Sequence, residues 1–159
     1  MPPAPDPLPA GSLTGAVDRC RRDEAFLADL AEILRQADAA TTSNTCRACG
    51  QCCHFEEFGH RLYVSTGELA LLTAVEPPGP CRPGRCPYQV GSRCTARQRR
   101  SLGCRVFFCD EAGGETSAEL YEKHHGQIRR LHARSRMDYH YVELTAALAQ
   151  LFPPGPGQP

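Results

Sequence analysis

Four cysteines stand within eight residues of this chain, in the segment CRACGQCC. They are Cys46, Cys49, Cys52 and Cys53. Two successive C-x-x-C steps bring three sulfur atoms toward one metal ion or cluster, and bacterial ferredoxins use this spacing with a fourth ligand from a distant part of the chain. Side chains of adjacent residues point apart in extended backbone, so Cys52 and Cys53 can serve two different centres. The segment therefore predicts half of a ligand set, for one centre or for two.

The other half of the predicted set lies downstream, between residues 86 and 109. Four thiolates also hold structural zinc, but such zinc sites usually combine two C-x-x-C pairs separated by a finger. Only the first block of this chain contains that step, and it contains it twice. The spacing therefore favours an iron–sulfur cluster over Zn2+ as the cofactor, and both stay open. The eight predicted metal ligands are Cys46, Cys49, Cys52, Cys53, Cys86, Cys94, Cys104 and Cys109.

This pattern resembles the zinc- or iron-chelating CxxCxxCC family of bacterial cysteine-cluster proteins (YkgJ-like). That family combines a CxxCGxCC block with a later series of the form C-P, C and R-P-x-x-C-R-x-F-x-C. The present chain has Cys86-Pro87, then Cys94, then RSLGCRVFFC over residues 100–109. Ser101 and Phe108 stand where the family usually has proline. The resemblance covers residues 46–109 and implies metal or iron–sulfur binding.

Two other functions remain as alternatives. A group of flagellin lysine methyltransferases shares the motif, so the resemblance also allows a metal-dependent enzyme, redox or methyltransferase-like. A thiol redox protein would need a C-x-x-C pair at the start of a helix, where the helix lowers the pKa of the first thiol, but HFEEFGH follows the block here and no βαβ pattern precedes it. No nucleotide-binding glycine loop and no nucleophile–base arrangement identifies a catalytic residue, so the sequence leaves open whether the protein is an enzyme.

The remaining cysteines and histidines are expected to play lesser parts. Cys20 falls on the apolar face of a predicted helix and is expected to be a buried thiol. Cys81 is either a surface thiol or a substitute ligand. His54 directly follows the cysteine block and is a candidate for supporting or replacing a ligand. The histidines of a later helix, at positions 124, 125 and 132, are expected to pack or to face solvent.

Charge and composition bear on the compartment and on partners. The 18 basic and 18 acidic residues cancel, the start MPPAPDPLPAGS has no apolar run of a secretory signal, and no stretch approaches the roughly 18 apolar residues of a membrane span. We therefore expect a cytoplasmic protein without membrane contact, where clustered cysteines more often bind metal than form disulfides. Between Cys81 and Cys109 there are seven arginines and no acidic residue. This run is expected to offset thiolate charge rather than to bind nucleic acid, and whether the protein has a protein partner stays unknown from the sequence.

The expected fold class is mainly α, with a small irregular, cysteine-rich metal-binding core and room for a short β-hairpin. One domain is expected over residues 15–152, with the core at 46–109 between flanking helices at 16–38 and 117–151. Disordered Pro-rich tails are expected at 1–14 and 153–159. Leu, Ile, Val and Phe total only 29 of 159 residues, so we expect the metal to help hold the fold.

Local patterns predict individual elements. An amphipathic helix is expected from Val17 to Ala37. Ser65 and Glu68 match a capping box that opens a helix with Leu69, Leu72 and Val75 on its buried side, and Thr116 with Glu119 matches a second, opening a helix that carries Leu120, His124, Ile128 and Leu131. A hairpin is expected around Gly91-Ser92, an extended piece in CRVFFCD, and a last helix from Val142 to Leu151.

Overall fold

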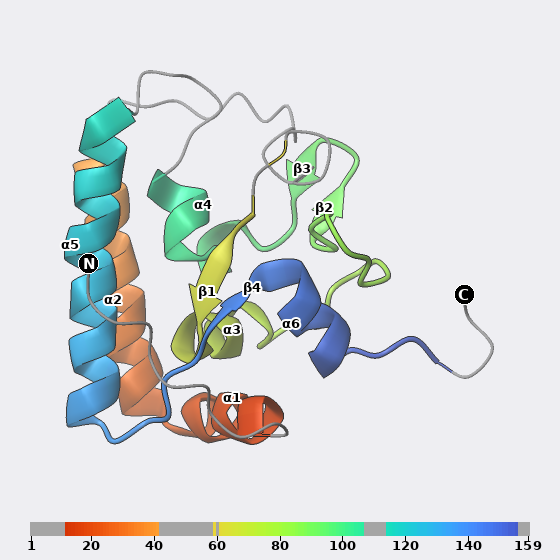
Figure 1. Ribbon diagram of the computed structural model, residues 1–159, viewed down its shortest axis with the longest axis horizontal. Helices are drawn as coiled ribbons and strands as arrows, with labels where there is room; N and C mark the ends of the chain where they lie inside the picture. The colour runs from red at the N-terminus through yellow and green to blue at the C-terminus, as the bar shows by residue number, and fades with distance from the viewer. Residues whose placement is uncertain (1–11, 42–58, 60, 107–113, 156–159) are drawn as a thin grey trace.

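The computed structural model describes residues 12–41, 59, 61–106 and 114–155. Within these residues the chain forms six α-helices and two antiparallel sheets of two strands each (Figure 1). The expectation of a mainly α-helical protein is confirmed. The cysteine-rich metal-binding core stays a prediction, because the CRACGQCC segment lies outside the described residues. No helix in the described part is long and apolar enough to cross a membrane.

The first described segment is two helices, so the single helix expected from Val17 to Ala37 is wrong. Helix α1 spans Ser12–Arg22 and helix α2 spans Glu24–Ala40. Asp23 between them has extended backbone, and its carboxylate accepts a hydrogen bond of 2.9 Å from the N–H of Phe26, which makes it the N-cap of α2. The apolar spacing continues in phase across the break, so periodicity alone could not reveal it.

Helix α1 also corrects the expected tail over residues 1–14. Residues 12–14 belong to α1, and Leu13 is buried in the core. Apolar contact therefore orders this end of the described chain. Residues 1–11 and 156–159 lie outside the described residues.

The predicted capping box at Ser65 is confirmed. Strand β1 (Tyr63–Ser65) leads directly into helix α3 (Thr66–Leu72), with Ser65 as N-cap and Glu68 in the reciprocal position. Leu69 and Leu72 are buried as expected. Val75 is 53% exposed, because the helix ends at Leu72 and Val75 lies beyond it.

A second short strand pairs with β1 from far away in sequence. Strand β4 (Tyr141–Glu143) runs antiparallel to β1, with Val142 opposite Val64. The last helix, α6, spans Leu144–Leu151, two residues shorter than expected, because residues 142 and 143 belong to β4. Glu143 caps α6 by accepting hydrogen bonds from the N–H groups of residues 145 and 146.

The expected hairpin at Gly91-Ser92 is confirmed, with strands β2 (Gln89–Val90) and β3 (Arg93–Cys94). Gly91 has a φ of 61°, a conformation that glycine adopts without steric cost. A 3-10 turn at Arg97–Arg99 and helix α4 (Leu102–Val106) follow. The extended piece expected in CRVFFCD is therefore wrong for residues 104–106, which are helical, and residues 107–110 lie outside the described part.

Helix α5 spans Gly114–Arg134 and packs antiparallel against α2 (Figure 1). The expected helix is present, but its expected capping box is wrong, because Thr116 lies inside the helix instead of before it. His124, Ile128 and Leu131 are buried on it, and Leu120 is partly buried.

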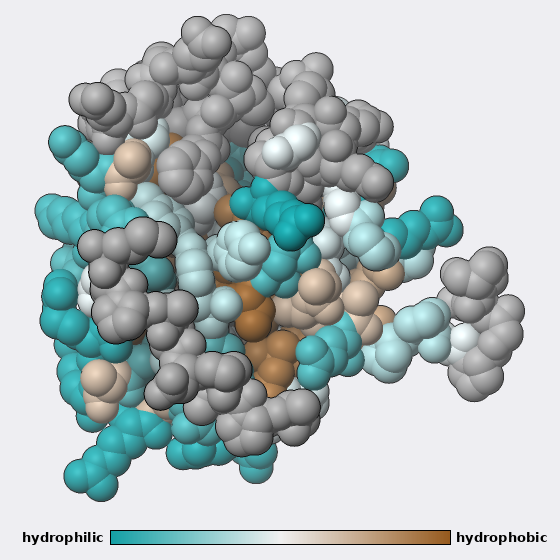
Figure 2. Space-filling view, in the orientation of Figure 1, coloured by the Kyte–Doolittle hydropathy of each residue, from teal (hydrophilic) through white to brown (hydrophobic). Residues whose placement is uncertain are grey.

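The hydrophobic core gathers around α3, which packs against α1 and α2. The described part of the face seen in Figure 2 is mostly hydrophilic, with hydrophobic residues at the surface near β4 and α6. A small core of this kind makes each buried polar contact important to stability. Its members include Val17, Phe26, Leu30, Leu69, Ile128, Leu131, Leu144 and Leu148.

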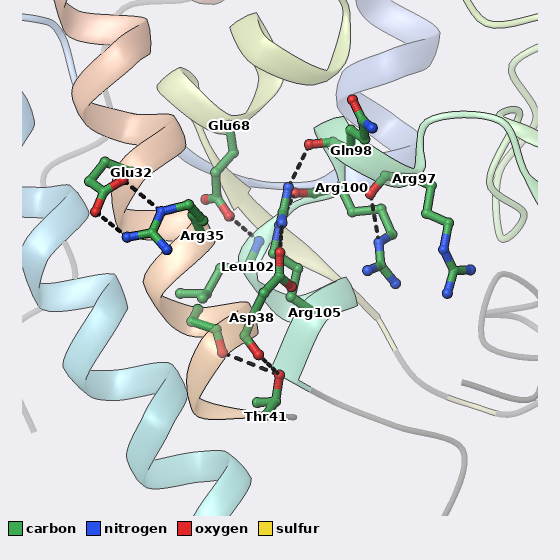
Figure 3. Close-up of polar contacts among 11 residues, drawn as sticks. Glu32, Arg35, Asp38, Thr41, Glu68, Arg97, Gln98, Arg100, Leu102 and Arg105 are labelled. Atoms are coloured by element: carbon green, nitrogen blue, oxygen red, sulfur yellow. Dashed lines mark hydrogen bonds and ion pairs between the residues drawn. The ribbon is translucent and has the colours of Figure 1, made fainter. Parts of the chain in front are cut away.

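One buried carboxylate connects two helix starts within this core (Figure 3). Glu68 is 2% exposed, and its Oε2 accepts hydrogen bonds of 2.7 Å from both the N–H and the Oγ–H of Ser65. Its Oε1 accepts a third, also 2.7 Å, from the N–H of Leu102 at the first residue of α4. Burial raises the pKa of Glu68, and these hydrogen bonds act against that rise.

We predict that Glu68→Ala lowers the free energy of unfolding by about 3 kcal/mol, because it leaves buried N–H groups of two helices without an acceptor. Glu143→Ala is the matched control, since Glu143 caps only its own helix at a partly exposed position, and it should cost about 1 kcal/mol. Urea denaturation measures both variants. Equal losses would show that the bond to Leu102 contributes nothing.

His132 forms a second buried link, between α5 and α3. Its Nε2 accepts a hydrogen bond of 3.3 Å from the N–H of Gly67, and its Nδ1 lies 3.4 Å from the carbonyl oxygen of Met137, to which it donates. A Cβ on Gly67 would lie 3.0 Å from both this Nε2 and the ring of Phe26. His132 is thus a packed side chain, as expected, and burial lowers its pKa.

The lowered pKa of His132 predicts loss of stability in acid. Because its folded pKa lies below the ordinary 6.5, the unfolded chain binds the proton first, and the free energy of unfolding should fall as the pH drops through 6.5. Asp138 favours the charged form of His132 and His140 disfavours it. Both residues are the same in the wild-type protein and in the variant that tests this prediction. His132→Gln should be less stable at pH 8 but show a flatter dependence between pH 8 and 5. Identical slopes in the two proteins would contradict the assignment.

Candidate functional site

Three of the eight predicted ligands, Cys86, Cys94 and Cys104, lie in the described part of the chain. The other five, and His54, lie outside it. Among the described residues no disulfide is formed, and no three histidine, cysteine or acidic side chains converge in an arrangement that could hold a metal ion. The eight-cysteine site as a whole therefore stays a prediction.

The β2–β3 hairpin positions two of the cysteines. Cys86 is buried just before β2 and its carbonyl accepts a hydrogen bond of 3.3 Å from the N–H of Gln89, while Cys94 lies opposite Gln89 on β3. Tyr88 anchors the hairpin, because its buried ring lies in the core and its O–H donates to the carbonyl of Val75 at 2.7 Å. Burial raises the pKa of Tyr88, so the phenol stays a donor.

Helix α4 positions Cys104. The hydroxyl of Ser101, which is 2% exposed, donates a hydrogen bond of 3.4 Å to the Sγ of Cys104. Hydrogen bonds to sulfur stabilise thiolate and tune the reduction potential of clusters, so Ser101 is equipped to influence a ligand at Cys104.

The next residue, Arg105, fastens α4 to the end of α2 (Figure 3). Its side chain is 6% exposed and ion-paired with Asp38 in the last turn of α2. The same guanidinium donates to the carbonyl oxygens of Arg100 at 2.8 Å and Gln98 at 2.7 Å. Asp38 therefore offsets the charge of Arg105. Asp38 lies outside the arginine run, and the sequence did not indicate it as a partner of Arg105.

This ion pair lies close to two ends of the described chain, at residues 41 and 106. Thr41, the last described residue before CRACGQCC, donates through Oγ1 to the carbonyl oxygens of Ala37 and Asp38. Val106, the last described residue before Cys109, follows Arg105 directly. Figure 1 shows the ends of α2 and α4 at the same end of the molecule.

The two cysteines outside the predicted set differ in burial. Cys20 is fully buried on α1, as expected, and burial raises its pKa to about 11. Cys81 is partly buried and packs against the core, and burial raises its pKa as well. Neither thiol is activated for nucleophilic chemistry, which requires a lowered pKa.

His124 is a feature that sequence reasoning did not single out. It is 2% exposed in the middle of α5, and its Nδ1 lies 2.9 Å from the Oε1 of Gln127, one turn later on the same helix. Its Nε2 is buried, and it has no hydrogen-bond partner among the described residues. Its spacing with Leu120, Ile128 and Leu131 on the helix indicated burial, but the sequence could not show what its ring nitrogens contact.

The sequence analysis also did not predict an aromatic cluster formed by residues of α5, of β4 and of the segment just before β4. The Nε2 of His125 lies 2.5 Å from the hydroxyl of Tyr139, and the hydroxyls of Tyr121 and Tyr141 are 2.5 Å apart. The His125 ring stacks on Tyr141, with 4.8 Å between the ring centroids. Burial raises the pKa of Tyr121 and Tyr139 and lowers that of His125, so all three groups stay neutral near pH 7. The cluster packs the second strand of the β1–β4 sheet onto α5.

Comparison of the chain with protein-family models, with curated proteins and with solved structures found no match.

The Asp38–Arg105 pair predicts that neutralising two different acidic residues of α2 changes the stability of the protein by different amounts. Asp38→Asn should lower the free energy of unfolding by about 2 kcal/mol, because it removes the countercharge of a buried guanidinium. Glu32→Gln is the matched control, since Glu32 pairs with Arg35 on the exposed face of α2 and should change stability very little. Urea denaturation at pH 7 compares them. Equal effects would contradict the anchoring role of Arg105.

Proposed function

We propose that the protein binds a metal centre, an iron–sulfur cluster or Zn2+, through the cysteines of its two cysteine-rich segments. The observation that carries the proposal is the spacing of the cysteines, with two successive C-x-x-C steps in CRACGQCC and a downstream series that ends at Cys109. The ligand set is Cys46, Cys49, Cys52, Cys53, Cys86, Cys94, Cys104 and Cys109.

The positions of Thr41 and Val106, the described residues nearest to the two undescribed cysteine segments, support this ligand set. Cys46 follows Thr41 by five residues and Cys109 follows Val106 by three, and chain segments of these lengths span at most about 18 Å and 11 Å. Because the Asp38–Arg105 pair holds α4 against the end of α2, both segments start from the neighbourhood of Cys104. Cys104, Cys109 and the CRACGQCC block can therefore reach a common region.

The residues around Cys104 suit a bound thiolate. Ser101 donates a hydrogen bond to the Cys104 sulfur, and Arg105 is close enough for the two groups to interact electrostatically. When bound, an iron–sulfur cluster would supply electron transfer, and Zn2+ would supply a structural cross-link or a Lewis acid. The chain's part is to provide thiolates and to hold them in place.

A thiol redox protein is the less favoured function, and the two described thiols outside the proposed ligand set do not suit it. Burial raises the pKa of Cys20 and Cys81, which keeps both thiols protonated and slow to react. A metal-dependent enzyme, redox or methyltransferase-like, stays compatible with the same ligand set. We further propose that the protein acts in the reducing cytoplasm and, with its net charge of zero, without nucleic acid as a partner.

Purification without oxygen tests the metal proposal. We expect coloured protein that contains iron together with acid-labile sulfide, because the cysteine triple favours a cluster. Colourless protein with stoichiometric zinc and no sulfide would keep the ligand set and overturn the choice of cluster. Protein that holds neither metal in stoichiometric amount would refute the proposed function.

Two cysteine variants complete this test. Cys104→Ser should lose metal and soluble fold together, because metal binding supplies folding free energy in a protein with so few core residues. Cys20→Ser is the matched control, with full metal content and only a loss of packing. Release of metal from both variants alike would mean that α1 takes part in the centre.

A further inference from the structure

Two arginines lie directly opposite each other at a tight turn before the β2–β3 hairpin. Arg82 and Arg85 form an isolated antiparallel β-bridge around Pro83 and Gly84. Side chains of directly opposite residues project from the same face of such a pair, with Cβ atoms about 4.5–5.5 Å apart, and like charges placed in this way are destabilising. Both arginines are exposed, and neither forms an ion pair among the described residues. The turn therefore presents two positive charges side by side.

The backbone of this turn is held in one conformation. Gly84 has a φ of 79°, as at the third position of a type II turn, and Pro83 precedes it at the second position, where proline is common. The N–H of Gly84 donates a hydrogen bond of 3.2 Å to the Oγ1 of Thr145, which is 4% exposed at the start of α6. The carboxylate of Glu143 accepts hydrogen bonds from the N–H and the hydroxyl of the same Thr145, and within the described structure it is in ion-pair contact with neither arginine. The two arginines thus start from a fixed backbone.

The burial of the neighbouring residues shows which way the arginine side chains face. Arg85 is exposed, whereas the adjacent Cys86 is buried in the core. Arg82 is exposed, whereas the adjacent Cys81 is partly buried and packs against the core. Both arginine side chains therefore face solvent, where a ligand can reach them, rather than the buried sulfur of Cys86.

We propose that Arg82 and Arg85 bind a phosphate monoester dianion. Two opposed guanidiniums supply two positive charges and planar pairs of N–H donors, which match the charge and the oxygens of this group. A phosphorylated serine carries a charge of about −1.5 to −2 near pH 7, whereas a phosphodiester of nucleic acid carries one charge per phosphate and matches the pair less well. The monoester can belong to a phosphorylated side chain of a partner protein or to a small sugar phosphate. The site consists of described residues alone and does not depend on the proposed metal centre.

NMR titration of the protein purified without oxygen tests this site, with a glycine-flanked phosphoserine peptide as the probe and the arginine side-chain N–H signals as the readout. Arg82→Gln and Arg85→Gln should each weaken binding by about tenfold, because each removes a charged hydrogen-bonding group. Arg93→Gln is the matched control and should keep wild-type affinity, since this exposed arginine has Val90 opposite it instead of a second arginine. No binding by the wild-type protein would overturn the inference. Equal losses in all three variants would also overturn it, because they would show attraction to net charge alone.

A variant of the turn separates the paired geometry from the charge. Gly84→Ala keeps both arginines but places a side chain at a φ of 79°, a conformation that residues other than glycine rarely adopt, and it should weaken binding of the peptide. Unchanged affinity would contradict the paired site.

Two further probes identify the source of the phosphate. Binding of either the phosphoserine peptide or glucose 6-phosphate supports the site, and the tighter of the two indicates whether a partner protein or a small molecule supplies the group. Tighter binding of single-stranded DNA at physiological salt would overturn the choice of a monoester. Each arginine variant should keep the wild-type metal content, and loss of metal together with loss of peptide binding would assign the arginines to the metal centre instead.

Discussion

The buried carboxylate of Glu68 is the interaction on which the arrangement of the described fold depends. Within its own segment it closes the capping box with Ser65 that starts α3. Across 34 residues it accepts the N–H of Leu102 and so fixes where α4 begins. Burial of an acidic side chain is unfavourable, and three hydrogen bonds compensate for it here. Because α4 carries Cys104, the same carboxylate that holds the core together also places a proposed metal ligand.

A second polar contact, between Arg105 and Asp38, links α4 to α2. Arg105 follows Cys104 directly and is ion-paired with Asp38, so α4 is held between α3 and α2 by one buried acid and one buried base. These two contacts add to apolar packing in which Leu102 and Val106 of α4 share one core with residues of α2 and α3. A metal centre that linked Cys104 to the segments after Thr41 and Val106 would strengthen the same end of the molecule. Folding and metal binding would then be coupled.

The histidines of α5 illustrate how burial assigns different roles to one residue type. His132 is a neutral acceptor for the start of α3, and His125 is part of an aromatic cluster with Tyr139 and Tyr141. The Nδ1 of His124 lies 2.9 Å from the Oε1 of Gln127, and its buried Nε2 has no partner among the described residues. A helix surface brings residues 124, 128 and 131 to one face, but it does not specify what covers that face. The neighbouring elements decide what each histidine contacts.

The sequence by itself determined the features that depend on residues close together in the chain. The helical class, the Ser65–Glu68 capping box and the hairpin at Gly91 follow from local hydrogen bonding and local backbone preference. The cysteine ligand set stays a prediction from the sequence, because five of its eight members lie outside the described residues. Tertiary structure decided the rest. The β1–β4 pairing, the helical state of Cys104 through the bond from Leu102 to Glu68, and the buried nitrogen of His124 all depend on contacts between distant segments, whose partners no local pattern specifies.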